Sequence, residues 1–125
     1  MRFPESMDKI GAFFNASGAP GELIRGVERN VPADWCAYAV KVADKEVTVA
    51  LFGAPDNPRS PTTWFTMFDP FSYMSATLNL YKEPMDLKEG DSLRLHYAVV
   101  LWDEKVSPEK VSAVYSTWKK TVHTP

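Results

Sequence analysis

The sequence is poor in the residues that build disulfides, metal centres and nucleic-acid surfaces. Its single cysteine, Cys36, excludes an internal disulfide and a multi-cysteine metal site. The two histidines, His96 and His123, have no metal-ligand spacing with each other or with Cys36, so we expect no metal or other cofactor. The net charge is only −2 and the basic residues are scattered along the chain, so we predict no nucleic-acid partner.

Long apolar runs and the common catalytic motifs are missing as well. No apolar run approaches the ~20 residues of a membrane helix, and the N-terminus lacks the basic-then-apolar pattern of a secretory signal. We therefore expect a soluble, cytoplasmic chain without a membrane partner, and leave open the export of a longer parent protein. The absence of GxSxG, HExxH, a phosphate-cradling glycine loop and paired CxxC removes the usual signatures of nucleophilic hydrolysis, nucleotide binding and structural zinc.

Proline and aromatic residues are abundant in a chain of one-domain length. The 125 residues fit a single domain over residues 1–125, with 45% apolar and 24% charged residues, as is typical of a globular protein. Ten prolines and 13% aromatic residues favour loops and strands over a helical bundle.

The first half of the chain is expected to centre on a β-hairpin. Residues 35–42 and 47–52 are rich in aromatic and β-branched residues and flank a plausible turn, so they predict two central antiparallel strands. Cys36 lies in the first of them, where we expect a small buried apolar group and not a reactive thiol. Residues 11–15 fit either a short strand or part of a helix that starts after Ser6 or Asp8.

The second half predicts two long strands, one helix and, as an alternative to a loop, a short strand at residues 85–87. Residues 74–81 alternate apolar and polar side chains, and residues 92–102 begin with the same alternation and end in an apolar run that we expect to be fully buried. Ser107 and Pro108 predict the start of a helix over residues 108–120. With six or seven strands and one C-terminal helix, we predict a mainly β fold, an antiparallel β-sandwich of jelly-roll or supersandwich type.

The best candidate for a site is the loop over residues 53–61, which contains three prolines and must be rigid. Its Arg59 would hold a guanidinium pre-oriented for a carboxylate, a phosphate or sugar hydroxyls, or would pin the loop to Asp56 or Asp69. The aromatic residues that follow pack in the core or offer rings on which sugars stack. We expect the ligand-binding residues to be Asp56, Asn57, Arg59, Trp64 and His96.

Three functions remain open at this point. The first is a non-catalytic, or catalytically degenerate, module that binds a small molecule or carbohydrate beside Arg59. The second is a sugar-modifying enzyme that uses Asp56 or Glu83 with His96 as acid and base. The third is an assembly module in which the aromatic segment is a homodimer interface.

Residues 35–65 and 87–97 resemble the C-terminal part of a bacterial family often labelled "methane oxygenase PmoA". The resemblance lies in a W-x-x-Y strand, a hairpin, the Pro-Asp-Asn-Pro-Arg loop and a later L-x-x-G strand, and spans about residues 30 to 120. Since a membrane oxygenase subunit needs membrane helices and this chain has no run for one, the resemblance implies a soluble β-sandwich similar to those of carbohydrate-active proteins.

Two departures from that family bear on chemistry. Ala54 and Phe65 stand where the family has histidines, so the resemblance implies binding more than catalysis. The chain also lacks the longer N-terminal half of the family, which fits either a short form or a fragment. A half-sandwich would expose sheet edges or an apolar face, and we therefore expect a homodimer.

Overall fold

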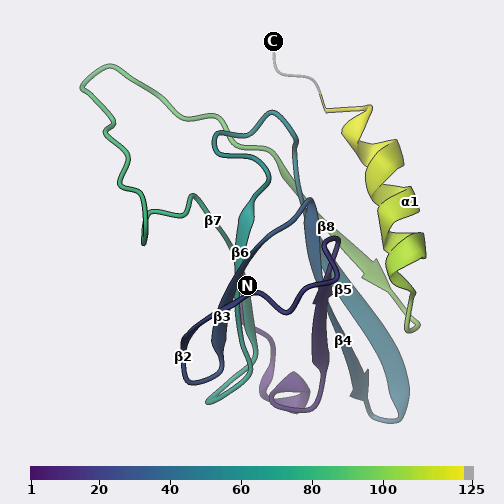
Figure 1. Ribbon diagram of the computed structural model, residues 1–125. Helices are drawn as coiled ribbons and strands as arrows, with labels where there is room; N and C mark the ends of the chain where they lie inside the picture. Colours follow the sequence, from purple (N-terminus) through teal and green to yellow (C-terminus); the bar gives the residue numbers. More distant parts are fainter. Residues whose placement is uncertain (123–125) are drawn as a thin grey trace.

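The computed structural model describes residues 1–122 and consists of two four-stranded antiparallel sheets with one helix (Figure 1). The predicted β-sandwich is confirmed, and His123 lies outside the described residues. The elements in chain order are η1 (Glu5–Met7), β1 (Ala12–Asn15), β2 (Glu22–Arg25), β3 (Glu28–Pro32), β4 (Trp35–Val42), β5 (Lys45–Gly53), β6 (Thr63–Met67), β7 (Tyr73–Thr77), β8 (Tyr97–Trp102) and α1 (Pro108–Lys119).

The predicted central hairpin is β4 and β5, which are the two inner strands of the sheet β1-β4-β5-β8. The strands pair from Trp35 opposite Phe52 to Val42 opposite Lys45. The connecting residues Ala43 and Asp44 have positive φ angles of 49° and 65°, as a tight two-residue hairpin turn requires. Residues 12–15 form the edge strand β1, so the strand is the alternative that the structure confirms there.

The second sheet has the order β2-β3-β6-β7, and only β7 corresponds to a strand predicted from the sequence. Strands β2 and β3 form a hairpin within a short charged segment that shows no alternation of apolar residues. Gly26 in the turn has a φ of 57°, which glycine adopts at little cost. Strand β3 then pairs with β6, with Val31 opposite Trp64.

The main core fills the space between the two sheets. Tyr38, Trp64 and Met74 are completely buried there. The Tyr38 hydroxyl bonds to the Met7 carbonyl and to the Ser72 hydroxyl, so its polar end is satisfied inside the core. Cys36 is buried as expected, and burial raises the pKa of its thiol to about 12.

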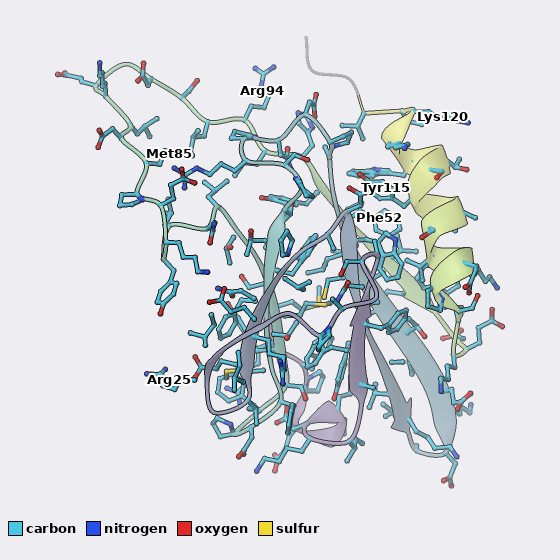
Figure 2. The ribbon with its side chains drawn as sticks, in the orientation of Figure 1. Arg25, Phe52, Met85, Arg94, Tyr115 and Lys120 are labelled. Carbon is cyan, nitrogen blue, oxygen red and sulfur yellow. The ribbon has the colours of Figure 1, made fainter. Side chains whose placement is uncertain are left out.

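A second core lies on the opposite face of the sheet β1-β4-β5-β8, under helix α1 (Figures 1 and 2). Phe52 packs edge-on against Tyr115, with ring centroids 5.3 Å apart. The predicted helix is confirmed: the Ser107 side chain accepts a hydrogen bond from the Lys110 N–H at 3.2 Å, and Pro108 occupies the first turn. No helix among residues 1–122 has the length and apolarity that crossing a bilayer requires.

Two strand predictions were wrong in their extent. Strand β7 ends at Thr77 instead of residue 81, and β8 begins at Tyr97 instead of residue 92. The end of β8 is not fully buried, because the side chains of Val99 and Leu101 are 55% and 68% exposed. The segment between the two strands has no regular structure and extends away from the sheets (Figure 1).

Candidate functional site

The proline-rich loop after β5 is held from within by Asn57, whose side chain is buried. Its amide donates to the His96 carbonyl at 2.9 Å and accepts from the His96 N–H at 2.8 Å. The Asn57 side chain thus pairs with the His96 backbone much as a neighbouring strand would. The two bonds anchor the loop, and the burial of the Asn57 side chain keeps it from a ligand on the surface.

Arg59 is likewise occupied by the protein itself. Its guanidinium donates to the carbonyls of Leu78 and Pro84 at 2.9 Å each, and to the Glu83 carbonyl. The prediction that Arg59 pins the loop to Asp56 or Asp69 is wrong, because all three acceptors are backbone carbonyls. Asp69 pairs instead with Lys9 at 3.1 Å. Arg59 therefore holds the turn that follows β7 in place.

Trp64 faces the core. It is fully buried, and its indole N–H donates to the Ala33 carbonyl at 2.8 Å. A sugar stacks only on an exposed ring, so the expectation that Trp64 offers a binding face is wrong. Its position opposite Val31 in the sheet turns the side chain inward.

The remaining candidates for an acid and a base are Asp56, Glu83 and His96. Asp56 and Glu83 are exposed, and no hydrogen bond or ion pair within residues 1–122 joins either of them to the His96 side chain. The Nε2 atom of His96 is buried without a hydrogen-bond partner among the described residues. The described part of the chain contains no group of three or more histidine, cysteine or acidic side chains that could hold a metal ion.

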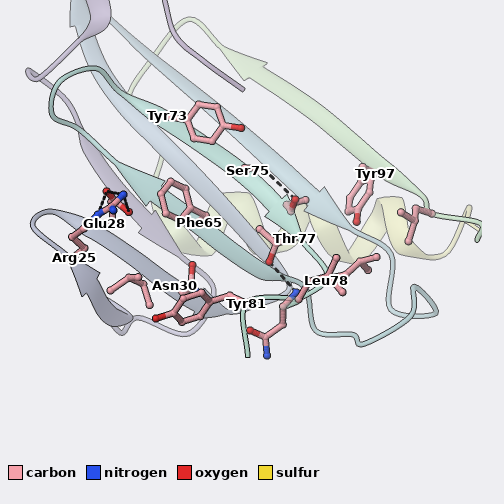
Figure 3. Close-up of a pocket in the computed structure, with 15 residues that line it drawn as sticks. Arg25, Glu28, Asn30, Phe65, Tyr73, Ser75, Thr77, Leu78, Tyr81 and Tyr97 are labelled. Carbon is pink, nitrogen blue, oxygen red and sulfur yellow. Dashed lines mark hydrogen bonds and ion pairs between the residues drawn. The ribbon is translucent and has the colours of Figure 1, made fainter. Parts of the chain in front are cut away.

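A large groove lies elsewhere, on the face of the sheet β2-β3-β6-β7 that points away from the core (Figure 3). Its volume of about 860 Å³ is within the range of small-molecule sites. The floor comes from β3, β6 and β7, because Asn30 lies opposite Phe65 and Phe65 lies opposite Ser75 in the ladder. One wall is the turn after β7, which Arg59 holds, and Tyr97 at the start of β8 bounds another side.

Four aromatic rings line this groove: Phe65, Tyr73, Tyr81 and Tyr97. Phe65 and Tyr73 meet edge to face, with ring centroids 6.0 Å apart, so they form one platform on the sheet. Tyr81 is 73% exposed and lines the groove together with Asn30 (Figure 3). Partial burial raises the pKa of the Tyr97 hydroxyl.

The groove also offers polar groups without partners. Four side chains make no hydrogen bond within residues 1–122: the hydroxyls of Tyr73, Tyr81 and Tyr97 and the amide of Asn30. None of these polar atoms is among the buried atoms without a partner. Each is therefore free to bond to water or to a ligand. In contrast, the Thr77 hydroxyl donates to the Thr63 carbonyl at 2.7 Å and stiffens the floor.

An ion pair marks one end of the groove. Arg25 donates to the Glu28 carboxylate through Nε at 3.2 Å and Nη2 at 3.1 Å. Its two charges offset each other, so this end gives the groove no net charge that would select an ionic ligand.

Part of the groove was readable from the sequence. The alternation after Tyr73 places Ser75 and Thr77 on one face and Met74 and Ala76 on the other, and the polar face is the groove floor. Asn30 was missed because its strand has no apolar pattern. Tyr97 was treated as part of a strand, since nothing local shows that its ring reaches a different sheet.

These features define a class: an antiparallel β-sandwich with a helix on one outer face and an aromatic-lined groove on the other. The model of the family of unknown function DUF6807 matches residues 1–116, and the chain belongs to this family. No curated protein and no solved structure matches the chain.

Proposed function

We propose that the protein is a non-catalytic binding module whose groove takes a small, uncharged, hydroxyl-rich molecule, with a short carbohydrate as the best candidate. One observation carries the proposal: four aromatic rings and four unpartnered polar groups face the same groove. Sugars combine apolar C–H faces, which stack on aromatic rings, with hydroxyls that need hydrogen-bond partners.

The proposal moves the ligand away from the residues predicted from the sequence. Asn57, Arg59 and Trp64 act as supports, and Arg59 supports the groove wall directly through the Leu78 carbonyl. The finer resemblance to the C-terminal part of the methane-oxygenase-labelled family remains a prediction. The expected homodimer is not needed to form the groove, because residues of one copy of the chain line it.

Calorimetric titration with a panel of neutral oligosaccharides tests the proposal. At least one sugar should bind, and Phe65→Ala should weaken that binding by about two- to tenfold, since an aromatic contact is worth about 0.5–1.5 kcal/mol. Phe68→Ala is the matched control, because Phe68 is 45% exposed at the end of the same region but does not line the groove. Binding by no sugar, or equal losses in the two variants, would overturn the proposal.

A further inference from the structure

Strand β8 leaves one edge of its sheet open. It is the last strand in the order β1-β4-β5-β8, and within residues 1–122 it pairs only with β5. The Ala54 N–H donates to the His96 carbonyl, and β5 pairs Ala50 with Val100. Because hydrogen-bonding directions alternate along an antiparallel strand, the backbone groups of Tyr97, Val99 and Leu101 point away from β5.

This edge has none of the features that normally protect an open strand. The sequence from Tyr97 to Trp102 is YAVVLW, without a charge, a proline or a glycine. The same three residues that direct their backbone groups outward also expose their side chains, by 40% at Tyr97 and by more at Val99 and Leu101. Open backbone groups and an apolar row therefore occur together on one edge.

We propose that β8 pairs antiparallel with β8 of a second copy of this chain, around a twofold axis at Val99. The two sheets would join into one continuous eight-stranded sheet. An antiparallel edge is complementary to itself under a twofold axis, whereas a parallel arrangement is not. In this register Val99 lies opposite Val99 of the second copy, and Tyr97 lies opposite Leu101 of that copy. Each of the three residues whose backbone groups point outward therefore pairs with one of the same three in the second copy. The exposed apolar side chains of both copies lie on the same face of the joined sheet.

The charges beyond the two ends of β8 favour the same register. Arg94 lies three residues before β8 and Asp103 follows it directly, so the antiparallel register brings Arg94 towards Asp103 of the second copy, whereas the adjacent Glu104 already pairs with Lys110. Arg94 and Asp103 are both exposed, and neither makes an ion pair with any residue in the described range. A basic and an acidic side chain thus approach each other twice, once at each end of the paired strands.

The pairing goes beyond the proposed ligand site and does not rest on it. Tyr97 belongs to both regions, however, because its ring lines the groove and its backbone lies on the open edge. In the pair, Leu101 of the second copy comes next to Tyr97 and extends the apolar side of the groove.

Cysteine cross-linking of the whole chain tests the register. In Val99→Cys the two Cα atoms would lie about 5.5 Å apart, within the range of a disulfide, so mild oxidation should give a covalent dimer. In Leu101→Cys the two copies of the residue would be about 13 Å apart along the strands, too far to bridge. The native Cys36 does not interfere, because it is buried and its pKa is raised to about 12.

Leu23→Cys is the matched control, since Leu23 is 54% exposed on the edge of the other sheet and should not cross-link. Sedimentation of the unmodified chain should show a dimer whose dissociation constant rises about threefold in Arg94→Glu, and less at high salt. A monomer at all concentrations would overturn the proposal. A dimer in which Val99→Cys cross-links no better than Leu23→Cys or Leu101→Cys would overturn it too.

Discussion

The two outer faces of the sandwich carry similar aromatic side chains but treat them in opposite ways. On the sheet β1-β4-β5-β8, helix α1 covers Phe52, which is completely buried. On the sheet β2-β3-β6-β7, no helix within residues 1–122 lies over Phe65, and its ring forms part of the floor of an open groove. The difference shows that aromatic content alone does not identify a binding face.

The presence or absence of helix α1 over a face determines whether the tyrosine hydroxyls on that face are bonded within the protein. Tyr115 on the covered face satisfies its hydroxyl inside the protein, by donating to the Gly53 carbonyl at 3.0 Å. Tyr73 on the open face has no such partner within residues 1–122, so its hydroxyl remains available. Covered rings therefore stabilise the fold, and open rings offer a surface for a ligand.

The largest expected effect separates the two faces by stability. Phe52→Ala should lower the free energy of unfolding by about 3–5 kcal/mol, because it leaves a cavity under the helix. Phe65→Ala should cost about 1 kcal/mol or less, since the ring is only half-buried. Urea unfolding of both variants measures the difference, and equal losses would show that the open face is as much a structural core as the covered one.

Substitutions of Asn57 test whether its contact with the His96 backbone holds the loop over residues 53–61 in place. Asn57→Ala removes two hydrogen bonds to the His96 backbone in a buried setting and should cost about 2–3 kcal/mol. Asn57→Asp is the matched variant, because it keeps the acceptor and loses the donor. If thermal unfolding shows neither variant to be destabilised, the loop is not held in the way the contacts indicate.

Arg59 links the support to the groove wall. Arg59→Lys cannot reach three carbonyls at once, so we expect a loss of about 1–2 kcal/mol and faster proteolysis of the turn after β7. Ligand binding should weaken more than in Asp69→Asn, which removes only an exposed ion pair with Lys9. If the turn after β7 is cleaved no faster in Arg59→Lys than in the unmodified protein, the guanidinium does not hold that turn in place.

The smallest effect concerns alkaline pH. Burial, and then the nearby Asp34 charge, raise the pKa of Tyr115 to about 12, above its ordinary value of 10.0. The unfolded chain therefore loses this proton first, so the contribution of Tyr115 to stability is complete below about pH 10 and declines as the pH rises towards 12.

Tyr115→Phe removes that titration. At neutral pH the variant should lose about 1 kcal/mol with the hydrogen bond to Gly53, and above pH 10 the gap from the unmodified protein should narrow. Urea unfolding at pH 7 and pH 11 measures both values. A gap that widens with pH would contradict the sign derived from the pKa.

The sequence predicted the elements whose signals are local. The central hairpin and the helix after Ser107 were readable because strand composition, a tight turn and a capping residue lie within a few positions of one another. The hairpin of β2 and β3 was not, since its pairing depends on Gly26 and on a neighbouring strand rather than on an apolar pattern.

The candidate site was less predictable, because its roles depend on contacts far along the chain. Arg59 is directed inward by carbonyls about twenty residues later, and Trp64 is buried through its pairing with Val31. An arginine in a proline-rich loop has the same local sequence whether it binds a ligand or stabilises a neighbouring turn. Only the alternation around Ser75 and Thr77 pointed to the face that is open.

The most direct test of the central claim is amide NMR during titration with the best-binding oligosaccharide. If the open face binds ligands, saturable shift changes should gather on β3, β6 and β7 around Asn30, Phe65 and Ser75, while the residues under α1, such as Phe52, stay unchanged. Changes confined to the loop around Arg59, or no saturable change for any sugar, would contradict the claim.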